Sequence, residues 1–201
     1  MKKQHYLINE ETMYLMSKDN MGLVESKIGE LYGDGEICIC SPNKIIATNC
    51  KHHSQSYSAR KELTKLLTNT NSKLPIIIDL FGQHIFFCTH SDRIIDNNWF
   101  NIKHVVSYKT FDGNTRITFS NNEVIDIPIS FNSFNNQYLN ALKLHYRFSL
   151  QKEKAHQKEM SKIYHYSKLN NYNREKGSMI AESIDLLHMN YLEEINRKIE
   201  F

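Results

Sequence analysis

The sequence lacks any long apolar run, and it lacks the pattern of an export signal. No stretch approaches the roughly 18 consecutive apolar residues that a membrane-spanning helix needs. Acidic and amide residues interrupt the N-terminal stretch MKKQHYLINEE, so we expect neither a signal peptide nor a membrane partner. Four cysteines are too few and too scattered for a disulfide scaffold, which predicts reduced thiols in a cytoplasmic protein.

The short motifs of common enzyme classes are also missing. The chain has no glycine-rich phosphate loop, no nucleophile elbow, and neither an HExxH nor a DxDxDG run. Its ten histidines form no recognisable acid–base pair in the sequence. Catalytic groups can still meet in space from distant positions. We nevertheless expect that the protein is not an enzyme and binds no cofactor.

A zinc site is one alternative that the residue types permit. Cys38, Cys40, Cys50 and the pair His52-His53 supply thiolates and imidazoles, which are ligands that zinc prefers. Only one residue separates Cys38 from Cys40, whereas two residues separate the first pair in common zinc motifs. We therefore interpret the cysteines as small buried hydrophobic residues and expect no metal.

The net charge of +3 is too small to indicate a partner, but the charge is unevenly distributed. Residues 51–120 carry nine lysines and arginines against five acidic residues, and residues 143–176 carry nine against three. Residues 1–50 and 177–201 are net acidic. This distribution suits a protein that offers one face to a polyanion, although lysine-rich helices are often simply solvated.

Hydrophobic periodicity and turn residues predict an α+β fold, with an antiparallel β-rich core, bracketing helices and a helical C-terminal region. The alternating segments predict strands at 5–8, 12–16, 23–31, 36–40, 74–78, 84–87, 100–108, 116–119 and 124–129. Helical spacing and capping residues predict helices at 42–51, 57–67, 134 onward into the lysine-rich stretch 149–176, and 178–199. Tight turns are expected at 33–35, 112–114 and 121–122.

The stretch from Phe119 to Phe148 organises the rest of the chain, because one strand leads directly into one amphipathic helix. Pro128 limits the strand to an edge or an end. Helical spacing predicts an inward face formed by Phe134, Tyr138, Ala141, Leu142 and His145. A second face carries an amide and basic stripe formed by Asn136, Asn140, Lys143 and Arg147.

The densest cluster of basic side chains is expected around the helix at 57–67. Leu63, Leu66 and Leu67 are predicted to face inward, while Arg60, Lys61 and Lys65 project outward near Lys51. The polar loop 89–98 adds Arg93, Asn97 and Asn98, which can bond phosphates or groove acceptors. We interpret the single tryptophan, Trp99, as a core or rim anchor, the alternative being an aromatic wedge between base steps.

A resemblance to a known family rests on a series of short motifs in the same order. The run Pro128-Ile129-Ser130-Phe131-Asn132-Ser133-Phe134, followed by Asn136-Gln137, looks like the signature of the competence transcription factor family, ComK. Similar residues occur at Tyr57, Arg60-Lys61, Lys73, Pro75-Ile76, Asp79, Phe86-Phe87 and Phe119-Ser120-Asn121. The resemblance covers roughly residues 50–148.

The resemblance implies a bacterial activator of competence genes that reads A/T-rich promoter boxes through the minor groove. It implies a nucleoid-associated cytoplasmic protein that binds DNA as a homo-oligomer, a dimer or a tetramer, and that contacts RNA polymerase. Together with the basic cluster, it predicts DNA contacts by Lys51, Tyr57, Arg60, Lys61, Lys65, Arg93, Asn97 and Asn98. The stripe of Asn136, Asn140, Lys143 and Arg147 ranks second, because that helix could equally build a dimer interface.

The family also carries a hydrophobic degron read by an adaptor of the Clp protease. Ile163, Tyr164, Tyr166 and Lys168 occupy a similar place here, but little of the motif beyond Tyr166 and Lys168 is kept. We expect an α+β DNA-binding core at 1–148, with variable strands at 1–40, and a helical extension at 149–201. The alternative function is a protein–protein interaction module that has kept the fold without specific DNA binding.

Overall fold

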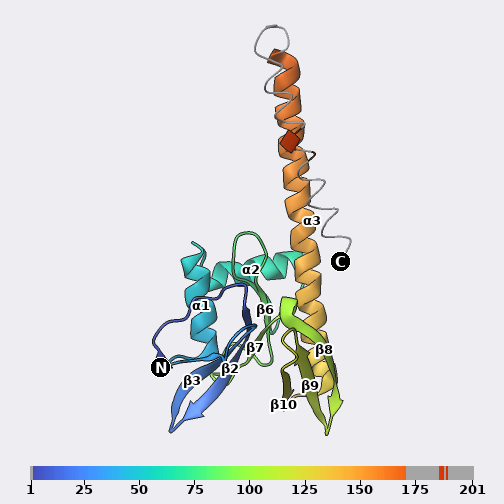
Figure 1. The fold of residues 1–201 in the computed structure, drawn as a ribbon. Helices are drawn as coiled ribbons and strands as arrows, with labels where there is room; N and C mark the ends of the chain where they lie inside the picture. The colour runs from blue at the N-terminus through green and yellow to red at the C-terminus, as the bar shows by residue number, and fades with distance from the viewer. Residues whose placement is uncertain (1, 171–185, 188, 190–201) are drawn as a thin grey trace. The chain divides into compact units, whose positions relative to one another are not determined.

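The structure, a computed structural model, describes residues 2–170, 186, 187 and 189, the side chains of 164–170 excepted. It divides into two compact units, Met1–Ser149 and Leu150–Phe201. The α+β class expected from the sequence is confirmed (Figure 1). The elements are β1 (Lys2–Lys3), β2 (Thr12–Asn20), β3 (Leu23–Glu30), β4 (Glu36–Cys38), α1 (Pro42–His52), α2 (Tyr57–Thr68), β5 (Ile76–Ile77), β6 (Ile85–Cys88), β7 (Trp99–Asn101), the 3-10 helix η1 (Ile102–His104), β8 (Val105–Phe111), β9 (Asn114–Phe119), β10 (Val124–Ile127) and α3 (Phe131–Asn170). No helix in this described part of the chain has the length and apolar character to cross a membrane.

Seven strands form one sheet in the order β1-β4-β3-β2-β7-β6-β5. All neighbours are antiparallel except β1 and β4. Because side chains alternate along a strand, adjacent residues of one strand enter different cores. Phe86 and Trp99 pack with Ile46 of α1, whereas Phe87 and Phe100 pack on the other face. The sheet is therefore covered on both faces, which gives the unit two apolar cores.

The second core joins the large sheet to a three-stranded sheet, β10-β9-β8, and to the first turns of α3. Phe134 lies at its centre, with its ring centroid 5.2 Å from that of Phe87, 5.8 Å from Phe100 and 4.9 Å from Tyr108. Aromatic pairs at such spacings add to the stabilisation from buried area. The strand-to-helix stretch thus closes the core, as its amphipathic pattern predicts.

Capping residues begin the helices where the sequence predicts them. Ser41 caps α1, with Pro42 at its first position, and the Ser56 hydroxyl accepts from the Ala59 amide at 3.1 Å at the start of α2. At α3, the Ser130 hydroxyl accepts from the Ser133 amide at 3.3 Å, so the helix begins at Phe131, three residues earlier than expected. The extension of this helix into the lysine-rich stretch is confirmed as far as Asn170.

Most predicted strands are present with shifted ends, but two predictions are wrong. Residues 5–8 form no strand, because the Asn49 side chain on α1 bonds the backbone of Tyr6 and Ile8, each at 2.9 Å. The single strand expected at 100–108 is broken by η1. The Asn101 side chain accepts from the Lys103 amide at 3.1 Å, which turns the chain from one sheet to the other.

The inward faces of two helices also differ from expectation. Leu66 is 80% exposed, whereas α2 buries Arg60, Thr64 and Thr68. On α3, Leu142 and His145 are exposed and Leu144 is buried. Apolar residues alone mark a helix face poorly where hydroxyl and guanidinium groups find backbone carbonyls inside. The predicted helix at 178–199 lies outside the described residues, apart from 186, 187 and 189.

Candidate nucleic-acid interface

One face of α2 forms the wall of a polar pocket with a volume of about 460 Å³. Tyr57, Lys61 and Lys65 recur at a spacing of four, which places them on one side of the helix. The segment after α2 and the loop 89–98 complete the wall. The lining residues are Tyr57, Lys61, Lys65, Asn71, Ser72, Lys73, Leu74, Cys88, Ser91, Asp92 and Arg93. Four cations thus surround one carboxylate.

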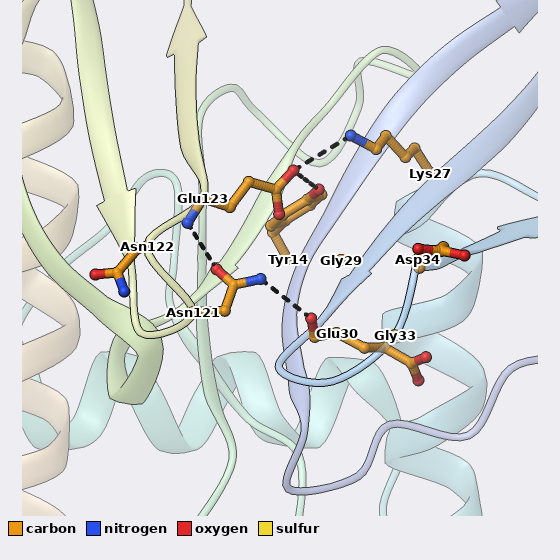
Figure 2. Close-up of a pocket in the computed structure, with 10 residues that line it drawn as sticks. Tyr14, Lys27, Gly29, Glu30, Gly33, Asp34, Asn121, Asn122 and Glu123 are labelled. Carbon is orange, nitrogen blue, oxygen red and sulfur yellow. Dashed lines mark hydrogen bonds and ion pairs between the residues drawn. The ribbon is translucent and has the colours of Figure 1, made fainter.

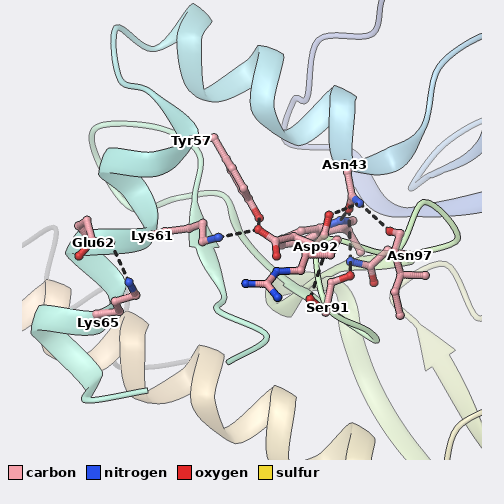
Figure 3. Close-up of polar contacts among 11 residues, drawn as sticks. Asn43, Tyr57, Lys61, Glu62, Lys65, Ser91, Asp92 and Asn97 are labelled. Atoms are coloured by element: carbon pink, nitrogen blue, oxygen red, sulfur yellow. Dashed lines mark hydrogen bonds and ion pairs between the residues drawn. The ribbon is translucent and has the colours of Figure 1, made fainter. Parts of the chain in front are cut away.

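Asp92 is the carboxylate, and it connects the loop to α2 (Figure 3). Lys61 Nζ lies 2.6 Å from Asp92 Oδ2, and the Tyr57 hydroxyl donates to the same oxygen at 3.1 Å. Burial works to raise the pKa of Asp92, but Lys61 and Tyr57 outweigh burial and leave the pKa lowered. Burial, followed by the Asp92 charge, raises the pKa of Tyr57. The Lys61–Asp92 pair is therefore ionised, and the Tyr57 phenol donates a hydrogen bond to the Asp92 carboxylate.

The loop that carries Asp92 and Arg93 is held by a network of two amide side chains, the half-buried Asn43 and the buried Asn97. The Asn43 side chain on α1 donates to the carbonyls of Asp92 and Ile94 at 3.0 and 2.9 Å, and accepts from Trp99 Nε1 at 2.7 Å. Asn97 donates to Asn43 at 3.3 Å and accepts from the His90 amide at 2.9 Å. Trp99 is fully buried, so it is the core anchor that the sequence predicts.

Two residues of the predicted DNA-binding set bond inside the protein, Asn97 across the loop and Asn98 to β2. Asn97 is fully buried, and its amide spans the loop instead of pointing to solvent. Asn98 is half-buried, and its carbonyl oxygen accepts from the Ser17 amide of β2 at 2.8 Å. A buried polar side chain is bonded inside the protein, which corrects the expectation that Asn97 faces DNA. DNA contact by the half-buried Asn98 stays a prediction.

Arg60 is the second correction, because the sequence predicts it to project outward. It is only 4% exposed, and its guanidinium donates to the carbonyl of Ile78 at 3.2 Å. Its Nε has no hydrogen-bond partner, and burial lowers the pKa of the group. Arg60 shares the inner face of α2 with Thr64 and Thr68 at helical spacing. The neighbouring Lys61 consequently faces the pocket, and Arg60 does not.

The remaining predicted residues divide into two groups. Tyr57, Lys61, Lys65 and Arg93 meet around the pocket, as their grouping in the sequence predicts. Lys51 is exposed in the last turn of α1 and is not among the pocket-lining residues. Sequence reasoning missed Lys73 as a site residue, although it lies in a polar loop directly after the basic helix. Its position in that loop is the signal that could have identified it.

The second-tier stripe lies on the outer side of α3. Asn136, Lys143 and Arg147 are exposed, and Asn140 is half-buried. An apolar row runs beside the stripe, formed by the exposed residues Leu139, Leu142 and Tyr146. No acidic residue occurs between 127 and 152, so the charged side chains in this part of α3 are all basic. The mixture of apolar and basic groups suits a protein or nucleic-acid contact.

A second hollow, of about 380 Å³, has the opposite electrostatic character (Figure 2). It lies between the turn after β3 and the turn before β10, and carries the carboxylates of Glu30, Asp34 and Glu123. Glu123 accepts from the Tyr14 hydroxyl at 2.8 Å and lies 3.5 Å from Lys27 Nζ. Carboxylates repel phosphate groups, so the α2 pocket is the better nucleic-acid site.

All four cysteines are free thiols, and Cys38, Cys40 and Cys50 are not among the residues that line the pocket. Burial raises the pKa of Cys38 to about 12 and that of Cys50 to about 11, which disfavours the thiolate that zinc requires. Within residues 2–170, 186, 187 and 189, no group of three or more His, Cys, Asp or Glu side chains is placed to hold a metal ion. Cys88 alone contributes to the pocket wall.

The degron candidates lie in the second unit. Residues 163–168 are helical within α3, and Ile163 is exposed. The side chains of Tyr164, Tyr166 and Lys168 lie outside the part of the structure that is described. Their accessibility to an adaptor therefore stays a prediction.

Comparison with known proteins gives a family and a relative. Residues 3–154 match the family described as ComK protein, so the match includes the N-terminal strands that the resemblance in the sequence left out. The chain is 31% identical over 151 residues to the competence transcription factor of Bacillus subtilis (strain 168), which covers 72% of this chain and 76% of that protein. No solved structure matches the chain significantly. The extent of the family match and this identity show that the chain belongs to the ComK protein family.

Proposed function

We propose that this chain is a competence transcription factor that binds A/T-rich promoter DNA through the minor groove as a multimer. Family membership and the name of the relative support regulation of competence transcription. The pocket of α2 supports the DNA part of the proposal, because Lys61, Lys65, Lys73 and Arg93 surround one concave surface. We place DNA binding in residues 1–149 and assign no catalytic step to the chain.

The single observation that carries the proposal is the position of these four cations around one pocket, on α2, on the segment after it and on the loop 89–98. Lys and Arg neutralise phosphates, and each neutralised phosphate releases counterions and strengthens binding at low salt. A narrow A/T minor groove has a strongly negative potential, which favours an exposed arginine such as Arg93. The Lys61–Asp92 pair must open for Lys61 to reach a phosphate, so binding exchanges one ion pair for another.

Binding to a duplex with paired A and T runs, measured by fluorescence anisotropy across salt concentrations, tests the proposal. We expect tight binding that a minor-groove drug displaces and that a G/C-rich duplex does not match. Lys65→Ala with Lys73→Ala should lower the affinity and reduce the slope of log K against log salt by roughly 0.9 for each lost contact. Lys18→Ala, at an exposed position on β2 outside the pocket, is the matched control.

Weak binding that responds to neither sequence nor drug would contradict the proposal. The interaction-module alternative would then be favoured, with the apolar row of α3 as its first candidate surface. If the wild type binds tightly and the lysine variants show the same salt dependence of DNA affinity, the pocket is not the DNA site, although the proposed function still holds.

We place self-association on the exposed row of Leu139, Leu142 and Tyr146, which lies beside the basic stripe of α3. Contact with RNA polymerase and with a Clp-protease adaptor are further parts of the proposal that follow from the family resemblance. For the adaptor, deletion of residues 163–201 should lengthen the half-life of the protein in cells that contain the protease. A half-life unaffected by the deletion would count against a degron in this segment.

A further inference from the structure

The tip of the loop 89–98 exposes two isoleucines next to the cation pocket. Ile94 is 46% exposed and Ile95 is 62% exposed, and they follow Arg93 directly. Burial of an isoleucine side chain is stabilising, so folding leaves a substantial part of this stabilisation unused. Single exposed apolar residues are common and need no explanation. This pair differs from such residues because hydrogen bonds hold the backbone that carries it.

Hydrogen bonds hold the backbone of both isoleucines while their side chains remain in solvent. The Ile94 amide donates to the Ser91 carbonyl at 3.0 Å, and the Ile94 carbonyl accepts from Asn43 at 2.9 Å. The Ile95 carbonyl accepts from the Asn97 amide at 2.9 Å. On the far side, the Ser17 hydroxyl donates to Asp96 at 2.9 Å. The loop is therefore preorganised, which reduces the entropy lost when its tip is immobilised by a partner.

Charge at the loop indicates what kind of partner fits. Lys61 neutralises Asp92 at the start of the tip, and Arg93 extends into solvent beside the other pocket cations. The tip itself is apolar and is followed by the carboxylate of Asp96, so it suits the stacked bases inside a groove better than a phosphate. Proteins that bind the minor groove frequently insert isoleucine, leucine, methionine or phenylalanine between base steps next to such cations.

We propose that Ile94 and Ile95 form an apolar wedge that enters the minor groove and partly unstacks one base step of the bound duplex. Arg93 lies in the adjacent groove, and Lys61, Lys65 and Lys73 hold the flanking phosphates. This inference rests on the proposed DNA-binding function and assigns its wedge. Pyrimidine–purine steps such as TA are flexible and easily unstacked, so the wedge adds a preference for sites that contain such a step, without a base-specific hydrogen bond. The buried Trp99 supports the wedge through Asn43 and does not itself enter DNA.

The test uses the full chain and a duplex of paired A and T runs, with 2-aminopurine at successive steps and fluorophores at both ends. Wild-type protein should raise the 2-aminopurine fluorescence at one step and bring the duplex ends closer, as kinks of about 20–90° do. Ile94→Ser with Ile95→Ser should lose both signals at saturating protein and low salt, and lose roughly tenfold in affinity for the A/T duplex. Val106→Ser, at a 66% exposed valine on β8, is the matched control.

The outcomes separate this inference from the function on which it rests. Wild-type binding without unstacking at any step, or a double-serine variant that unstacks the duplex normally, would overturn the wedge and leave DNA binding standing. Failure of the wild type to bind any duplex would overturn both. A double-serine variant that changes only the oligomeric state would assign the tip to a protein contact, which also overturns the wedge. Unchanged Trp99 fluorescence in the variant would show that the loop support is intact.

Discussion

Arg60 and Lys61 are adjacent basic residues with opposite environments. The Arg60 guanidinium lies inside, where it donates to the Ile78 carbonyl, while Lys61 lies at the pocket beside Asp92. One residue of helix rotates a side chain by about 100°, which is enough to exchange core for solvent. At the scale of the residue, the neighbours in space determine whether a cation stabilises the fold or is available to a polyanion.

Alanine substitutions at these two positions should therefore have opposite consequences. Arg60→Ala removes a buried stem and a hydrogen bond, so it should lower the free energy of unfolding by about 1–3 kcal/mol and leave DNA affinity of the folded protein unchanged. Lys61→Ala should leave stability nearly unchanged and weaken DNA binding. Urea unfolding and anisotropy titrations measure the two effects. Equal losses of DNA affinity in both variants would mean that Arg60 reaches the ligand.

His84 and His104 are both buried, and burial lowers the pKa of each. The folded protein therefore binds fewer protons than the unfolded chain below the ordinary histidine pKa of about 6.5. Stability should be full above that pH and fall as the pH drops from it towards the lowered pKa values. Lys103 strengthens the effect at both sites, while the Glu10 carbonyl, 2.8 Å from His104 Nε2, opposes it at His104.

His104→Gln isolates this effect, because its amide can donate to the Glu10 carbonyl and does not titrate. We expect the variant to lose less stability than the wild type between pH 7 and pH 5, measured by thermal unfolding at several pH values. The exposed His145 provides the control substitution, His145→Gln, which should retain the wild-type slope. Parallel curves for all three proteins would contradict a role for His104.

Strands β2 and β3 pack so closely at one point that a single added carbon atom would clash. Strand β3 pairs with β2 so that Gly29 lies opposite Tyr14, whose ring lies across the glycine. A Cβ on Gly29 would come within 2.0 Å of Tyr14 Cε1. The glycine thus makes room for a side chain that is also bonded to Glu123 near β10. The glycine therefore allows Tyr14 to connect a central strand of the large sheet to the turn before β10.

Gly29→Ala should displace the Tyr14 ring and lower the free energy of unfolding by about 1–3 kcal/mol, a typical cost of overpacking. Chemical denaturation measures the loss. The double variant Gly29→Ala with Tyr14→Ala removes the clash, so the two changes should be less than additive. Gly22→Ala is not a suitable control, because its positive φ strains any side chain. Ser107→Ala, at an exposed position on β8, is suitable, and a loss as large there would refute the packing argument.

At the scale of the whole molecule, the first unit presents three different surfaces. The α2 pocket is basic, the hollow by Glu30 and Glu123 is acidic, and the outer side of α3 combines apolar with basic groups. A small net charge of +3 conceals this separation. Local fields, more than net charge, guide a polyanion to one face. Separate surfaces of this kind suit the proposed multimer on DNA, in which DNA and a second copy of the chain would each need one.

Substitution of the α3 row should separate self-association from DNA binding. Leu142→Ser with Tyr146→Ser removes exposed apolar surface, so the fold should stay intact while the mass of the DNA-bound complex falls in sedimentation experiments. Leu66→Ser, at an exposed leucine on α2, is the comparison variant. An unchanged mass for the α3 variant on the same duplex would move the multimer interface elsewhere.

The local elements follow closely from the sequence. Ser41-Pro42 begins α1, and Asp112-Gly113 turns with both φ values positive, because these residues favour their conformations wherever they stand. The family motifs likewise led to the ComK family before the fold was known. The spacing of Tyr57, Lys61 and Lys65 placed three pocket residues on one helix face, since helical periodicity is a property of the chain alone.

Only the tertiary structure decided which polar side chains face solvent, where they can contact a ligand. Lys61 meets Asp92 from 31 positions away, and Asn43 reaches Trp99 from 56. Arg60 lies inside because the Ile78 carbonyl accepts its hydrogen bond, and Asn97 because it donates to the Asn43 side chain of α1. No local pattern encodes these partners. The exposed Ile94-Ile95 tip has the same origin, since a short apolar pair reads as core until the surrounding packing is known. Sequence periodicity determines faces, and long-range packing determines which of those faces meets solvent.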